Sequence, residues 1–72
     1  MQNEAKVDFL RRREHCLNRL GENLGYNIDE FADHKMYAAE FSDFVNRLEA
    51  CLRQIKAICS AIGDKADELG GA

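Results

Sequence analysis

Apolar residues recur at alternating steps of three and four through the second half of this 72-residue chain. The positions of this stripe are Phe31, His34, Ala38, Phe41, Val45, Leu48, Leu52, Ile55, Cys59 and Ile62, and His34 is its one polar interruption. Such spacing is typical of a helix that packs along one seam. A second row at spacing seven, Tyr37, Phe44, Cys51 and Ile58, widens the stripe to the face of a bundle helix. We therefore expect one long helix over about residues 28–62.

The rest of the chain also favours helices. It contains no proline, and Ala, Leu, Glu, Arg and Lys dominate its composition. Leu10, Leu17 and Leu24 are spaced by seven, with Leu20 at an intermediate position, so a first helix is expected over about residues 4–24. Asn3 is a suitable N-cap for it. The fold class is accordingly all-α.

Local signals place the turn between these helices at about residues 25–27. Gly25 is suited to end the first helix, and Gly21 is the alternative. Asn27 and Glu30 have the spacing of a capping box, and Tyr26 and Phe31 have that of a hydrophobic staple. So short a turn makes the helices antiparallel. Gly63 is expected to end the second helix, which gives a hairpin domain over 1–63 and a flexible tail over 64–72.

These bounds give a short first helix and a long second helix, with an apolar overhang beyond about Glu49. Leaving that overhang in water is improbable for a small protein, so another chain is expected to cover it. The expected assembly is a bundle of four helices from a dimer. This inference requires a second helix that is continuous through Ala38-Ala39, since a break there would give three helices. The expected interface residues are Phe41, Phe44, Val45, Leu48, Leu52, Ile55, Ile58, Cys59 and Ile62.

Composition argues against most kinds of chemistry. Cys51 and Cys59 lie eight residues apart, too far to bridge on one helix, and three reduced cysteines fit a cytoplasmic location. His15 and His34 lack the partners of a metal site. His15 and Cys16 point in different directions on a helix, so no catalytic pair is expected. No apolar run approaches the roughly 18 residues of a membrane span, and no cofactor is expected.

The sequence therefore predicts a non-enzymatic protein-interaction module, such as a small adaptor, co-chaperone or assembly factor. Its partner would be a second copy or another helical protein. The alternative is a small nucleic-acid-associated regulator that uses Arg11, Arg12, Arg19 and Arg47. The net charge of −3 disfavours this alternative, because broad phosphate binding needs a basic surface.

Two kinds of helical hairpin are similar to this chain in general form. In size it resembles the RNA-binding hairpin regulators of plasmids, which build a four-helix bundle from two hairpins with near-equal helices. In length, and in the stretch Ala61-Ile62-Gly63-Asp64, it is similar to the hairpin chaperones of type III secretion needle subunits. Neither resemblance includes a specific motif, so no family is assigned.

Overall fold

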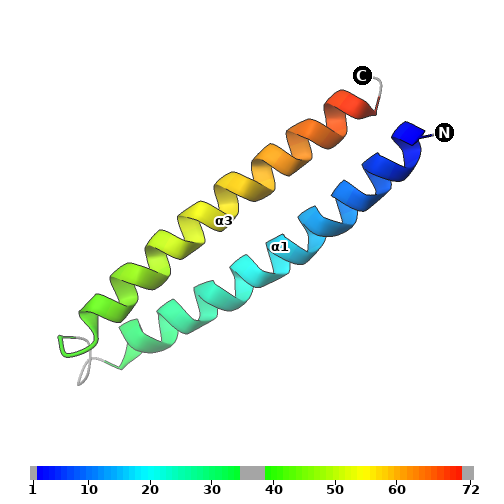
Figure 1. The fold of residues 1–72 in the computed structure, drawn as a ribbon. Helices are drawn as coiled ribbons and strands as arrows, with labels where there is room; N and C mark the ends of the chain where they lie inside the picture. The colour runs from blue at the N-terminus through cyan, green and yellow to red at the C-terminus, as the bar shows by residue number, and fades with distance from the viewer. Residues whose placement is uncertain (1, 35–38, 71–72) are drawn as a thin grey trace.

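The chain folds into an antiparallel hairpin of two helices, seen in a computed structural model that describes residues 2–34 and 39–70. Helix α1 spans Gln2–Asp33, and helix α3 spans Ser42–Leu69. They pack along their length, with both chain ends at the same end of the molecule (Figure 1). The Cα atoms occupy a rod of 55 × 14 × 14 Å. The all-α hairpin expected from the sequence is confirmed.

The expected turn and helix lengths are wrong. Helix α1 has 32 residues and continues through Gly21, Gly25 and Asn27, so the chain reverses between Asp33 and Ser42. Asn27 does not cap a helix; its side-chain amide donates a hydrogen bond to the backbone oxygen of Asn23 at 2.8 Å. Helix α3, with 28 residues, is the shorter of the two.

Pairing of the two helices explains why the turn lies later in the chain than the local signals predict. A capping residue contributes about 1 kcal/mol, whereas each large apolar side chain that is buried contributes roughly 1.5–3 kcal/mol. Nearly equal helices bring the whole apolar stripe of α3 against α1. The local stop and start signals around Gly25 are therefore outweighed by packing along the rod.

Each helix contributes one seam of partly or fully buried residues with alternating steps of three and four. On α1 the seam residues are Val7, Leu10, Glu14, Leu17, Gly21, Leu24, Ile28 and Phe31. The second seam, which begins just before α3, contains Phe41, Val45, Leu48, Leu52, Ile55, Cys59, Ile62, Ala66 and Leu69. The sequence correctly predicted which positions from Phe41 to Ile62 form the seam. Phe31 belongs to the other helix, His34 follows α1, and Ala38 and Tyr37 lie outside the described residues.

The apolar overhang does not exist. An ideal Cβ on Gly21 would lie 3.5 Å from Leu52 Cδ1, and the Cys59 thiol donates to the backbone oxygen of Glu14 at 3.4 Å. Helix α1 therefore covers the segment that was expected to require another chain. Helix α3 also passes Gly63 and ends at Leu69, so the expected tail is helical over 64–69.

The two ends of the rod are packed differently. Toward the termini the buried residues of α3 are small, namely Cys59, Gly63 and Ala66. Near the chain reversal, Phe31, Phe41 and Phe44 form an aromatic cluster with ring centroids 5.9–6.5 Å apart. Edge and tilted contacts of this kind add to the stability given by burial.

Replacing Gly25 with alanine should stabilise the protein by about 0.5–1 kcal/mol, because alanine is the better residue inside a helix. An ideal Cβ at position 25 meets nothing within 4 Å. Urea unfolding followed by circular dichroism measures the change. A loss of stability would indicate that Gly25 terminates a helix, as the local signals imply.

Replacing Ile55 with aspartate should unfold the hairpin, since Ile55 lies in the seam and not on a surface reserved for a partner. We expect a loss of more than about 2 kcal/mol, from lost apolar burial and a poorly solvated charge. Ala57→Asp, at an exposed position of the same helix, is the matched control. Equal melting temperatures for the two variants would show that Ile55 does not hold the helices together.

Candidate interaction surfaces

Two helices bury only a narrow line of contact, and this leaves large apolar side chains in solvent. Within the described part of the chain, Cys59 and Ala66 form the whole buried apolar core. The exposed large residues are Phe9 (56%), Leu20 (46%), Tyr26 (72%), Phe44 (50%) and Ile58 (54%). With the exception of Tyr26, each of these residues immediately precedes a seam residue in the sequence.

Six exposed apolar residues lie on one side of the hairpin, and we call them the apolar face. They are Phe9, Cys16 and Leu20 of α1, and Phe44, Cys51 and Ile58 of α3. Each immediately precedes a seam residue, so each lies about 100° from the seam in the same rotational sense. Because the helices are antiparallel, the same sense of rotation on both leads to the same side of the rod.

Two shallow pockets at the ends of the rod support this assignment. One is bordered by Lys6 and Phe9 of α1 and by Lys65 of α3, which brings Phe9 and both cations to a common side. The other, near the chain reversal, is bordered by Asn27, Glu30 and the rings of the aromatic cluster to which Phe44 belongs. The apolar face therefore has cations at its terminal end and Glu30 at the other.

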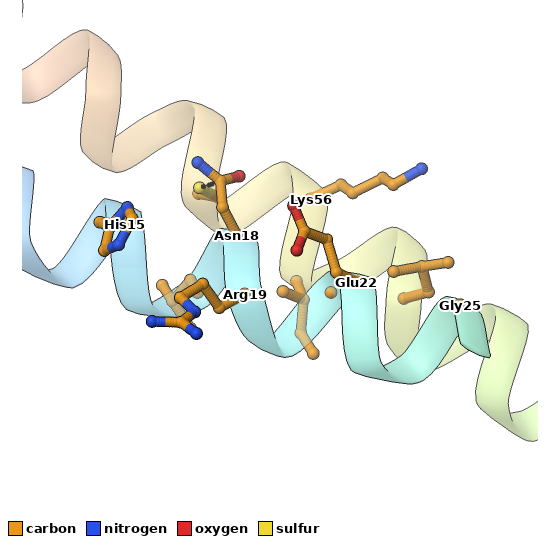
Figure 2. Close-up of a pocket in the computed structure, with 11 residues that line it drawn as sticks. His15, Asn18, Arg19, Glu22, Gly25 and Lys56 are labelled. Atoms are coloured by element: carbon orange, nitrogen blue, oxygen red, sulfur yellow. Dashed lines mark hydrogen bonds between the residues drawn. The ribbon is translucent and has the colours of Figure 1, made fainter. Parts of the chain in front are cut away.

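The opposite side of the hairpin carries a groove of about 530 Å³. Its lining residues are His15, Leu17, Asn18, Arg19, Gly21, Glu22, Gly25, Leu52, Ile55, Lys56 and Cys59 (Figure 2). The two glycines lack side chains that would fill it. Asn18 accepts a hydrogen bond from the Cys59 thiol through Oδ1 at 3.2 Å, so its oxygen is engaged within the hairpin.

The groove brings together no metal-binding set from the residues that the structure describes. In the described ranges, 2–34 and 39–70, no group of three or more His, Cys, Asp or Glu residues is placed to hold a metal ion. Figure 2 shows Glu22 of α1 and Lys56 of α3 at the rim and His15 toward one end. We therefore regard the groove as a consequence of Gly21 and Gly25 of α1.

A polar layer interrupts the seam near the termini. Glu14 occupies a seam position, and its carboxylate lies over Gly63, where an ideal Cβ would overlap it. Arg11 donates to Glu14 at 3.2 Å and also to Asp67. The hydrogen bonds to Asp67 and then Glu14 raise the pKa of Arg11 above its ordinary value. The absence of a side chain at position 63 thus lets a charged group fit between the helices.

The residues expected to form an interface separate into two groups. Seven of them line the seam against α1, namely Phe41, Val45, Leu48, Leu52, Ile55, Cys59 and Ile62. Phe44 and Ile58 lie on the apolar face. An interface with another chain at any of these positions stays a prediction.

The sequence reasoning missed the contribution of α1 to the apolar face. It placed Leu20 on the first helix's stripe, but the seam residue is Gly21, and Leu20 is exposed. Phe9 and Cys16 were not part of that stripe. If Glu14 and Gly21 are counted as seam members, the seam is regular from Val7 to Phe31. The three exposed residues are then recognisable, because each immediately precedes a seam residue.

The arginines of the alternative, nucleic-acid hypothesis are mostly engaged with acids. Arg11 contacts Glu14 and Asp67, Arg12 pairs with Asp8 at 3.0 Å, and Arg47 pairs with Asp43 at 3.0 Å. Arg19 borders the groove. The four guanidinium groups therefore do not combine into a separate basic surface.

No family model, curated protein or solved structure matches this chain. Over its described residues, neither helix has the combination of length and apolarity needed to cross a membrane.

The fit of Glu14 over Gly63 predicts strong coupling between these positions. Gly63→Ala alone should destabilise the hairpin, because the new methyl group displaces the carboxylate from its place between the helices. In a Glu14→Ala background the same substitution should stabilise by about 0.5–1 kcal/mol through helix propensity. Urea unfolding of the four proteins gives the coupling energy, which for contacting residues is roughly 0.5–3 kcal/mol. If the two substitutions change the free energy of unfolding additively, Glu14 does not lie against Gly63.

Proposed function

We propose that this chain is a non-enzymatic protein-interaction module, of the adaptor or assembly-factor kind, that binds a helical partner through the apolar face. The observation that carries the proposal is the gathering of half-exposed Phe9, Leu20, Phe44 and Ile58 on one side of a rod. Large contiguous apolar patches on small proteins mark interaction sites. Helix-on-helix packing is the mode that suits a straight apolar strip.

The weakness of the hairpin core supports the same proposal. The described residues include no large side chain that is fully buried. A single core in a chain of this size rarely supplies more than about 3–5 kcal/mol, and oligomerisation is one common remedy. Covering the apolar face would convert two-helix packing into bundle packing, in which the flanking rows are also buried.

The nucleic-acid alternative has weaker support. The net charge is −3, and three of its four arginines already contact carboxylates of the same chain. Binding of that kind would lose affinity steeply with salt, because each phosphate contact releases counterions. The absence of binding at about 50 mM salt would dismiss this alternative.

Alkylation of Cys51 tests the proposed function. Cys51 is an exposed free thiol on the apolar face, so a bound partner should protect it. In a Cys16→Ser/Cys59→Ala background, we expect maleimide to react with Cys51 at least tenfold more slowly in intact cells of the source organism than in the urea-unfolded chain. The readout is intact-protein mass against time.

A second thiol controls for reagent access. Ala57→Cys, with Cys16, Cys51 and Cys59 all replaced, places a single thiol at an exposed α3 position away from both the seam and the apolar face. This introduced thiol should react rapidly in cells and in purified protein alike. If Cys51 reacts as fast as the introduced thiol in both settings, the apolar face has no partner and the proposed function is wrong.

A further inference from the structure

We infer that the apolar face pairs with the apolar face of a second copy of this chain, with the two hairpins antiparallel, to give a four-helix bundle. This inference rests on the proposed function, because it names the partner of the same surface. Three observations support it: the exposed area, the symmetry of the apolar strip, and the distribution of charge along it.

The exposed area matches what a dimer requires. The chain exposes 5684 Å². A compact protein of its mass, 8.2 kDa, exposes about 4,500 Å² by the usual scaling. The excess of roughly 1,100 Å² per chain exceeds the approximately 800 Å² per partner that a standard stable interface buries. One copy of the same rod is therefore large enough to cover the excess.

The apolar strip is arranged about the middle of the rod. Phe9 lies toward the terminal end and Phe44 toward the chain reversal, with the other apolar residues between them. A twofold axis across the rod at its middle therefore places each helix over the same helix of the second copy, so the central apolar residues of the two strips meet. In this arrangement Leu20 lies near Leu20 of the second copy, and Cys51 lies near its Ile58. Such self-complementarity is the property of an isologous interface.

Charge selects the antiparallel orientation. The cations Lys6, Arg13 and Lys65 lie at the terminal end of the face, where Lys6 and Lys65 border the same pocket and the Arg13 guanidinium lies 5.7 Å from the Phe9 ring centre. Because Lys65 already pairs with Glu68 at 3.6 Å, a parallel pair would gather the remaining cations, Lys6 and Arg13 of both copies, at one end. An antiparallel pair instead places Lys6 and Arg13 of α1 opposite the Asn27–Glu30 region of the second copy, and attraction replaces repulsion.

The position of Glu30 is explained by the same arrangement. An acidic residue near the C-terminus of a helix is disfavoured by the helix dipole. The last turn of α1 contains no basic residue, although Asp33 and Glu30 lie at that end. In the described structure, the Glu30 carboxylate lies 3.9 Å from His34 Nδ1. Lys6 and Arg13 of a second copy would supply the positive charge that the last turn of α1 lacks.

A charge exchange tests both the partner and the orientation. The acidic variant carries Lys6→Glu and Arg13→Glu, and the basic variant carries Asn27→Lys and Glu30→Lys. Helicity should be preserved, because Lys6→Glu adds an acid near the start of α1 and Glu30→Lys adds a base near its end. Light-scattering mass after size exclusion should show a dimer, twice 8.2 kDa, for the wild type at low micromolar concentration.

Each variant alone should dimerise at least tenfold more weakly than the wild type, because like charges then oppose each other in the antiparallel pair. An equimolar mixture should restore the dimer, since each acidic position meets a basic one. The control is Arg12→Glu/Arg19→Glu, which changes net charge as much as the acidic variant does but lies outside the apolar face; its dimer should persist. Variants that dimerise normally, or a mixture that stays monomeric, would overturn the antiparallel arrangement.

The purified wild type separates failure of this inference from failure of the proposed function. A folded monomer at tens of micromolar would overturn self-pairing. If Cys51 is nevertheless protected in cells, the partner is a different chain and the proposed function stands. If Cys51 reacts freely in both settings, both proposals are wrong.

Discussion

Two packed helices share one line of contact, and most properties of this molecule follow from that limit. A seam of two positions in seven buries only a narrow stripe on each helix. Both seams here are regular over the length of the rod, from Val7 to Phe31 and from Phe41 to Leu69. The large apolar residues that the structure describes outside them remain exposed, however well the hairpin is formed. The apolar face is therefore what remains after two helices have buried all that their geometry allows.

The sequence was sufficient to predict the hairpin and the phase of its second seam, but not the position of the turn. The signals at Gly25, Asn27 and Glu30 are local, and each is weak compared with the burial of an apolar side chain. The segment His34-Lys35-Met36-Tyr37-Ala38 contains no glycine, proline, asparagine or aspartate that would mark a reversal. Only the requirement that both stripes be paired along their length locates the reversal between Asp33 and Ser42.

The error in the turn changed which residues appeared to need a partner. With a short first helix, Leu52 and Ile55 seemed to extend beyond their own chain, whereas α1 covers them. The positions left exposed are Phe44 and Ile58, which the second row at spacing seven had already indicated. The α1 residues of the apolar face were harder to identify from the sequence. Two positions of the α1 seam are occupied by Glu14 and Gly21, so the apolar residues of α1 do not show where its seam lies. Residue spacing thus identified half of the apolar face, and pairing of the helices was needed for the rest.

The same two seam residues connect the fold to the proposed assembly. Glu14 brings a carboxylate into the helix contact, and Gly21 leaves its place in the seam unfilled, so α1 packs less effectively than a continuous leucine stripe would. The acids at the C-terminal end of α1 add an unfavourable interaction with its dipole. A partner that binds only the folded hairpin would add to its stability, because binding to the native state alone shifts the folding equilibrium. Folding and association of this chain would then be coupled, and the apolar face would be both its interaction surface and the missing half of its core.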